Sequence, residues 1–200
     1  MFKNILLITQ ITSRSKCFIN SLKDIFDNLE INCFLVECLC QGEEEIIFSP
    51  YAKAEYENEL LLNKKRLENI GFKVNTKLLS PHSLKQNLAE IITKNKIDLV
   101  ALPIHHKTVF EDLFSSKINK ILLKNYKLPI LFVRTFDTDV FFDGKVNKSK
   151  LLNKALFATD FSKSSETALK HIKYLIKSGL KNIHVVHIQE TDESPEITKE

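Results

Sequence analysis

Short apolar runs alternate along the chain with longer segments in which apolar residues recur every three or four positions. An uninterrupted apolar run is typical of a parallel strand buried on both faces, and the longer spacing is typical of an amphipathic helix. The runs predict strands at residues 5–9, 31–39, 97–102 and 129–133, and alternating apolar and polar positions predict an edge strand at residues 72–79. The periodic segments predict helices at residues 13–29, 50–69, 80–92 and 110–124. We therefore expect an α/β fold, a five-stranded parallel sheet with right-handed crossovers and helices on both faces.

The chain also contains an internal repeat. Residues 4–37 align with residues 154–187 at a constant offset of 150 and without a gap, with apolar positions matching apolar positions. A repeat of this kind indicates a second copy of the same supersecondary unit. We expect a complete domain in residues 1–135, a linker in residues 136–150, and the first β-α-β unit of a truncated second copy in residues 151–200.

The composition and charge pattern argue against several classes of function. Charged residues make up 27% of the chain, the net charge is +4, and acids are interleaved with the lysines. That mixture argues against a nucleic-acid-binding surface, which would concentrate its positive charge. No apolar run approaches the roughly 18 residues of a membrane-spanning helix, and the one that begins at Ile5 is too short for a secretory signal. A cytoplasmic location is expected, with the four cysteines reduced and structural.

Three segments carry a family resemblance. The run LFATDFS at residues 156–162, followed by Ser164 and Ser165, resembles the first strand and turn of universal stress protein (UspA-like) domains. The run PILFVR at residues 129–134 is similar to the closing strand of that family, and IDLVAL at residues 97–102 to the strand before its nucleotide signature. The resemblance implies a Rossmann-like fold of the adenine-nucleotide alpha hydrolase type, in a tandem protein whose second domain is incomplete.

The resemblance also implies where a nucleotide would bind. ATP-binding members carry Gly, two residues, Gly, nine residues, Gly, then Ser or Thr, because glycines let the backbone approach phosphate oxygens closely. In this chain Leu102, His105 and Ser115 stand at the glycine positions, and only Ser116 matches. The loop implied is degenerate, so we expect a regulatory or binding module without a cofactor. The alternative is an ATP-binding protein in which His105 and Ser116 replace part of the lost loop.

The residue after the first strand supports the same expectation. Nucleotide-binding members of the family place an aspartate there, whereas this chain has Gln10. The second copy has the aspartate as Asp160, but it stops before its own phosphate loop. Ser116, Asp160 and His105 are therefore the candidate cofactor-binding residues, and we do not expect them to form one pocket.

Nothing in the sequence predicts catalysis or a metal site. The four glycines, at positions 42, 71, 144 and 179, are too scattered for a G-x-S-x-G elbow or a phosphate-binding P-loop. An adenylyl-transferring ATPase is a third possible class, but such enzymes need a phosphate-binding loop after the first strand, and this chain does not have one there. Ser162 and Ser165 with Glu166 are interpreted as the start of a helix. In the family, domains pair through the closing strand, so the resemblance implies a homodimer that forms through Pro129–Val133. It also implies that the protein acts in stress response through contacts with a protein partner.

Overall fold

A computed structural model describes residues 2–9, 15–26, 30–38, 50–80, 83–104, 117–134, 154–177 and 180–187. The chain divides into two compact units, an N-terminal unit, Phe2–Asn147, and a C-terminal unit, Lys148–Glu200. Each is described by itself.

The N-terminal unit is built on one sheet, whose strands are β1 (Asn4–Thr9), β2 (Ile31–Cys38), β3 (Phe72–Leu79), β4 (Leu99–Ile104) and β5 (Ile130–Arg134). The strand order is β3-β2-β1-β4-β5, and every neighbouring pair is parallel. This confirms the predicted five-stranded parallel fold. The order changes direction between β1 and β4, and the carboxyl ends of strands at such a point are where doubly wound proteins bind ligands.

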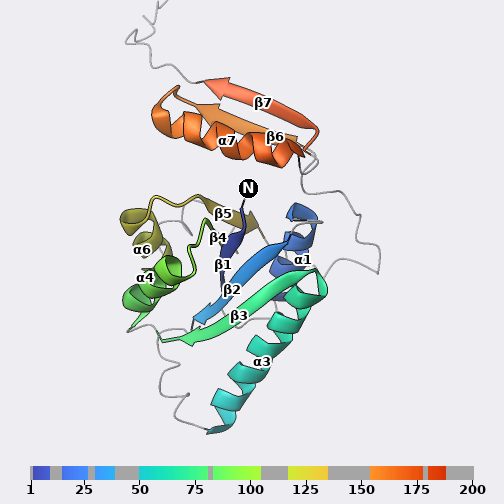
Figure 1. The fold of residues 1–200 in the computed structure, drawn as a ribbon, viewed down its shortest axis with the longest axis vertical. Coiled ribbons are helices and arrows are strands. Elements are labelled where there is room, and N and C mark those ends of the chain that lie inside the picture. Colours follow the sequence, from blue (N-terminus) through green and yellow to red (C-terminus); the bar gives the residue numbers. More distant parts are fainter. Residues whose placement is uncertain are drawn as a thin grey trace, which may run out of the picture. The chain divides into compact units, whose positions relative to one another are not determined.

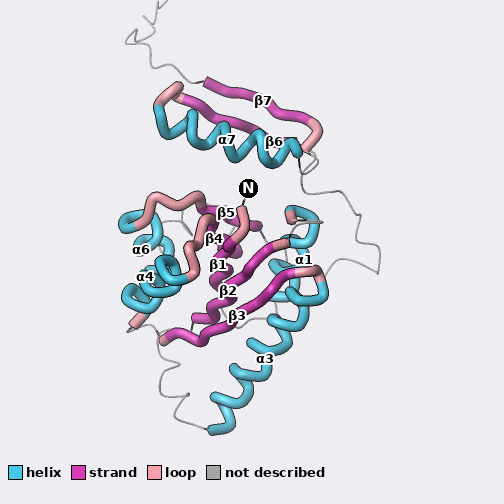
Figure 2. The backbone as a smooth tube through the Cα atoms, in the orientation of Figure 1, coloured by secondary structure: helices cyan, strands magenta, loops and turns pink. Residues whose placement is uncertain are grey.

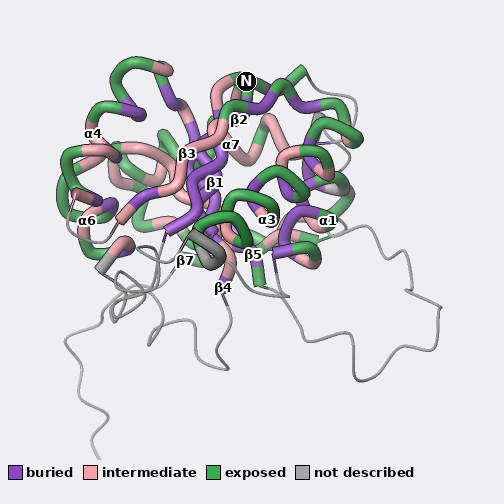
Figure 3. Tube along the Cα trace, turned by 90° about the horizontal axis from the view of Figure 1, so that it is seen from below, coloured by how far each residue is buried: buried purple, intermediate pink, exposed green. Residues whose placement is uncertain are grey.

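Helices cover both faces of this sheet. They are α1 (Ser15–Ile25), α3 (Pro50–Asn69), α4 (Leu84–Lys94) and α6 (Lys117–Asn125). Figures 1 and 2 show α1 and α3 on one side of the sheet and α4 and α6 on the other. Successive side chains of a strand point to opposite faces, so Leu7 of β1 packs in the cluster that contains Leu67 of α3, while Ile8 packs with Leu88 of α4. Figure 3 shows β1 buried and α3 largely exposed.

The start of β4 differs from the sequence prediction. The strand begins at Leu99 and extends to Ile104, two residues later at each end than predicted. Asp98 lies just before the strand. Its backbone N–H donates to the carbonyl of Asn4 at 2.9 Å, and its carboxylate accepts hydrogen bonds from the backbone N–H groups of Lys3 and Asn4, at 2.8 Å and 3.2 Å. The aspartate therefore anchors the beginning of β1, and Pro103 lies within β4 opposite Val133.

The C-terminal unit is a single β-α-β element. It consists of β6 (Lys154–Thr159), α7 (Lys163–Lys177) and β7 (Asn182–His187), and the two strands are parallel. In β1 and β2 the register joins Leu7 to Leu35, and in β6 and β7 it joins Phe157 to Val185, each residue 150 positions further on. The internal repeat is thus also a repeat of strand register.

Among the described residues, no helix is long and apolar enough to cross a membrane.

Candidate functional site

The predicted site residues fall into two groups. His105 and Ser116, together with Gln10 and Ser115, lie outside the described residues. Leu102 is described and lies within β4 opposite Phe132 of β5. Its side chain is buried in the core cluster shared by β4, α4 and α6. Leu102 is thus a core residue of the sheet.

The carboxyl ends of β1 and β2 hold a buried polar pair that the sequence analysis did not identify. Thr9 and Glu37 are register partners at these strand ends, and both side chains are buried, at 2% and 0% exposure. Side chains alternate between the two faces of a strand. Thr9 and Glu37 therefore lie on the same face as Leu7 and Leu35, which is the face covered by α1 and α3. Within α3, Asn63 is also buried, and its Nδ2 donates a 2.7 Å hydrogen bond to Glu37 Oε1.

A chain of hydrogen bonds runs from this pair along α3. Arg66 donates from one guanidinium nitrogen to Asn63 Oδ1, at 2.6 Å, and to Glu59 Oε1, at 3.1 Å. The side chains of Arg66 and Glu59 are about one-third exposed, 32% and 31%. The buried carboxyl is therefore linked through Asn63 to a partly exposed ion pair. The side chain of Asn63 is fixed at both ends, by Glu37 and by Arg66.

Burial raises the pKa of Glu37 above its ordinary value, because the charged form loses its hydration. The hydrogen bond from Asn63 lowers the pKa, and the negative charge of Glu59 raises it further. An interaction with the Thr9 side chain also lowers the pKa of Glu37, although Glu37 Oε2 and Thr9 Oγ1 have no well-formed hydrogen bond within the described part of the chain. The one sequence signal for this site is an acid inside the apolar strand INCFLVEC.

Asp160 stands in a tight turn between β6 and α7. Its Oδ1 accepts a 2.9 Å hydrogen bond from the backbone N–H of Ser162. Hydrogen bonds lower the pKa of Asp160 to about 2. The largest contribution comes from the side chain of Ser162, the next from the backbone of Ser162, and a third from the side chain of Ser165. The Ser162 hydroxyl in turn accepts from the backbone N–H of Ser165, at 3.3 Å. Ser162 is therefore the N-cap of α7, which confirms the interpretation of these serines as a helix start.

Thr159 completes this turn. Its hydroxyl donates to Ser165 Oγ and accepts from the backbone N–H of Phe161, each at 3.0 Å. Phe161 has a left-handed backbone, with φ at 59°, and its exposed ring lies 4.6 Å from that of His187. The polar groups of the turn are used in holding the helix start, and Asp160 itself is exposed. His184 and His187 lie on opposite faces of β7, as predicted, since they pair with Leu156 and Thr159.

A cavity of about 300 Å³ lies beside α7 in the C-terminal unit. Its lining combines apolar side chains of β6, the turn, α7 and β7 with a few polar groups. The residues are Phe157, Thr159, Phe161, Ser165, Glu166, Leu169 and Val185. Of the lining residues, Val185 is 64% exposed and Phe157 is 8% exposed.

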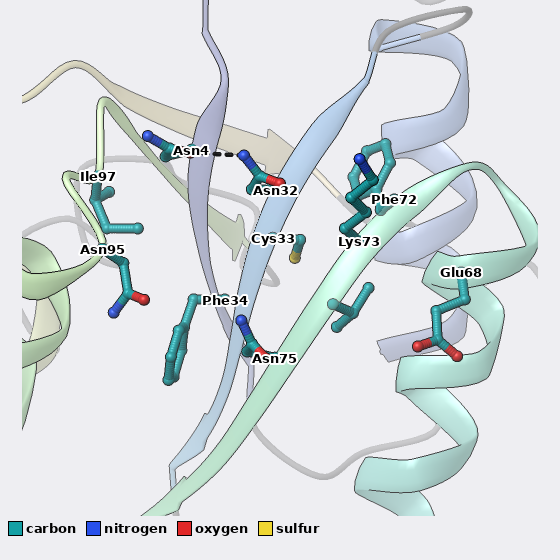
Figure 4. Close-up of a pocket in the computed structure, with 11 residues that line it drawn as sticks. Asn4, Asn32, Cys33, Phe34, Glu68, Phe72, Lys73, Asn75, Asn95 and Ile97 are labelled. Carbon is teal, nitrogen blue, oxygen red and sulfur yellow. Dashed lines mark hydrogen bonds between the residues drawn. The ribbon is translucent and has the colours of Figure 1, made fainter.

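A larger cavity of about 570 Å³ lies in the N-terminal unit at the amino ends of the strands. Figure 4 shows Asn4 and Asn32 facing each other there, joined by a 3.0 Å hydrogen bond between their side-chain amides. Asn4 Nδ2 also donates to the carbonyl of Lys96, at 3.1 Å. The amides serve to hold strand starts together, and this edge is opposite to the one at which α/β proteins bind ligands. We interpret the cavity as a structural depression.

The described residues offer no metal centre. They contain no group of three or more His, Cys, Asp and Glu side chains that could hold an ion. Cys17, Cys33 and Cys38 form no disulfide, and burial raises the pKa of Cys33 well above its ordinary value. A thiol held in the protonated form is a poor ligand and a poor nucleophile.

Comparison with known proteins identifies the type of fold. No protein-family model matches the chain, and no curated protein matches it. Among solved structures, a universal stress protein from Archaeoglobus fulgidus DSM 4304 superposes with a TM-score of 0.64 and 17% identity, over 96% of this chain and 68% of that one. The hypothetical protein MJ0577, whose structure was described as a structure-based assignment of biochemical function, superposes with a TM-score of 0.53 and 19% identity. That match covers 67% of this chain and 96% of MJ0577. The chain therefore has the UspA-like fold.

Proposed function

We propose that this chain is a universal-stress-protein-like binding module of the cytoplasm that acts through contacts with other protein chains and not through a bound nucleotide. The proposal rests on one observation: the sequence has no glycine between Gly71 and Gly144, and this stretch includes all of β4 and α6. A phosphate cradle between a strand and a helix needs backbone N–H groups brought close to the anion. Side chains at every position of this stretch oppose such an approach.

The contact surface we propose for self-association is strand β5. It is the last strand of the sheet, so one side of its backbone has no neighbour within the described sheet. Ile130, Leu131 and Phe132 of β5 are half-buried. An edge strand of this kind supports pairing with the same strand of a second copy. No residue is assigned a catalytic role, and the proposed module is not an enzyme.

A second candidate function, ATP binding through a remodelled loop, is favoured by one observation. Thr9 and Glu37 place two buried oxygen atoms that lack a well-formed hydrogen bond at the carboxyl ends of β1 and β2. A buried polar atom without a partner is costly, and a ligand is one way of satisfying it. Glu37 is nevertheless an acid, which disfavours a ligand that carries a triphosphate.

The two candidates differ in a measurable way. We expect protein purified without added nucleotide to release none on denaturation, judged by absorbance and mass. We also expect MgATP to leave the melting temperature where Mg²⁺ alone leaves it. A protein that bound ATP would gain about 2.7 kcal/mol at a concentration one hundred times its Kd, which raises the melting temperature measurably. Such a rise, or a co-purified adenine nucleotide, would replace the proposed function by the second candidate.

A further inference from the structure

The positive charge of the chain is concentrated in one stretch. Residues 117–134, which include α6 and β5, contain five basic residues and no acid. The net charge of the whole chain is +4, so the remaining residues together carry a net charge of −1. Acids and lysines are therefore interleaved along the rest of the chain, but not in this stretch. Its basic residues are Lys117, Lys120, Lys124, Lys127 and Arg134.

The two faces of the sheet in the N-terminal unit differ in the same way. Figure 1 shows α1 and α3 on one side of the sheet and α4 and α6 on the other. Together α1 and α3 contain six basic and five acidic residues. By contrast, α4 and α6 contain five lysines and one acid, Glu90, which forms a 2.6 Å ion pair with Lys94 of its own helix. Among the described helices, the positive excess therefore lies on the side of α4 and α6.

An exposed leucine lies among the lysines of α6. Leu123 is 47% exposed, whereas its neighbour Leu122 is 0% exposed and packs in the core. Because an α-helix has 3.6 residues per turn, Lys120, Leu123 and Lys124 fall within about 100° of its circumference. Lys127, just after the helix, is exposed as Lys120 and Lys124 are. Within the described part of the chain, none of these three lysines forms an ion pair. The outer side of α6 thus combines one apolar side chain with unpaired positive charge.

The remaining side chains of the stretch favour one kind of anionic partner. An amphipathic helix binds a lipid surface with its apolar face, but Ile118, Ile121 and Leu122 of α6 pack against the core. Single-stranded nucleic acid stacks its bases on exposed aromatic rings. The two aromatic residues of the stretch, Tyr126 and Phe132, also pack against the core. An acidic polypeptide needs neither feature, because its carboxylates pair with lysines and an apolar side chain covers the leucine.

We propose that the surface formed by Lys120, Leu123, Lys124 and Lys127, the α6 surface, binds an acidic segment of another protein. An apolar residue of that segment contacts Leu123, and carboxylates on either side of it pair with the lysines. An apolar centre within a polar rim is the usual arrangement of a protein interface. Complementary charges at the rim speed association and disfavour basic partners. The inference rests on the proposed function, action through contacts with other protein chains, and adds the chemistry of the partner.

A fluorescent peptide in which three glutamates stand on each side of a leucine is the probe. We expect it to bind the full-length protein saturably at low ionic strength, and more weakly as salt is added. The double change Lys120→Glu and Lys124→Glu should weaken binding about tenfold or more. The matched control is Lys53→Glu with Lys65→Glu, since both of these lysines are exposed on α3. It changes the net charge by the same amount and should leave binding nearly unchanged.

The leucine contact is tested by a double-mutant cycle. Leu123→Ser should weaken binding of the leucine peptide severalfold, and it should not affect a peptide with glycine in place of the leucine. Equal weakening of both peptides by Leu123→Ser would overturn the proposal. Equal weakening by the two pairs of charge reversals, or no binding by the leucine peptide, would also overturn it.

The other anionic partners are tested with the same variants. Vesicles of phosphatidylcholine and phosphatidylserine represent a lipid surface, and a single-stranded oligonucleotide represents nucleic acid. We expect both to bind more weakly than the leucine peptide. Tighter binding of either one, lost in the Lys120→Glu, Lys124→Glu variant, would assign the α6 surface to that partner and refute the acidic segment.

The two proposals can fail separately. A melting-temperature rise with MgATP that persists in the Lys120→Glu, Lys124→Glu variant refutes the nucleotide-free function and leaves the α6 surface unaffected. Loss of specific peptide binding with no response to MgATP refutes only the α6 surface.

Discussion

At the scale of single residues, Glu37 is an acid in an unfavourable, buried environment. It is fully buried, one of its oxygens lacks a well-formed hydrogen bond, and burial raises its pKa. A carboxyl whose pKa is higher in the folded protein than in the unfolded chain favours folding most at low pH. Its contribution is complete below the unfolded value of about 4.5 and is lost as the pH rises through the folded pKa.

Glu37→Gln should therefore make the protein more stable at pH 8 than the unchanged chain, by roughly 1–3 kcal/mol, because no buried charge has to form. The amide can still accept from Asn63 and can donate to Thr9. Urea denaturation at pH 8 and pH 4 tests this, and the difference should shrink at the lower pH. The exposed Glu55 provides the control, since Glu55→Gln should change stability little at either pH. A destabilising Glu37→Gln at pH 8 would mean that the carboxylate is held by a partner.

Asp160 shows the opposite behaviour for a different reason. Its pKa is depressed from 3.8 to about 2 by hydrogen bonds, so its contribution to α7 is present above pH 3.8 and lost as the pH falls through 2. Ser162→Ala removes the largest cause, and we expect the Asp160 pKa to rise towards 3.8. Carboxyl carbon NMR measures this directly. Ser164→Ala, at an exposed neighbouring position, should leave the pKa at about 2, and an unchanged pKa in Ser162→Ala would show that the cap is not its cause.

At the scale of elements, two backbone positions set the ends of helices. Gly71, which follows α3, has φ at +96°, and no atom lies within 4 Å of where its Cβ would stand. Gly71→Ala should destabilise the protein by roughly 1 kcal/mol through backbone strain alone. Lys96 after α4 has φ at 48° and is not glycine. Lys96→Gly should be neutral or stabilising, so thermal melts of the two variants should move in opposite directions.

The exposed edge of β5 is the second element-scale prediction. If two copies pair there, Leu131→Lys should convert a dimer to a monomer, because a charge on an edge strand discourages pairing. Light scattering coupled to size exclusion measures the mass. Leu123→Lys, on the exposed face of α6, is the matched control and should leave the dimer intact. An unaltered mass for Leu131→Lys would place the contact elsewhere.

Prediction from sequence succeeded where a pattern is local and periodic. Most strands were found because they are mainly apolar runs, β3 was found because its apolar and polar positions alternate, and the start of α7 at Ser162 was found because helix starts have known residue preferences. The start of β4 was placed two residues early. The anchoring role of Asp98 was missed because its partners lie 94 and 95 positions earlier, which no local pattern reveals. Glu37 was missed for the same reason, since its partner Asn63 lies 26 residues away.

At the scale of the whole molecule, one repeated framework occurs in two different environments. In the N-terminal unit β1 is flanked by β2 and β4 and covered on both faces, whereas β6 has only β7 as a strand neighbour within the described residues. Leu6 is 0% exposed, and its counterpart Leu156 is 69% exposed. Protection of backbone amides depends on how much structure must open to expose them. The same sequence pattern should thus yield two very different local stabilities.

Amide hydrogen exchange on the full chain tests this difference. We expect the amides of β1 to exchange only by global unfolding of the N-terminal unit, and those of β6 and β7 to exchange through local opening, at least a hundredfold faster. Equal protection of β1 and β6 would contradict this expectation, since it would show that β6 opens no more readily than the core strand β1.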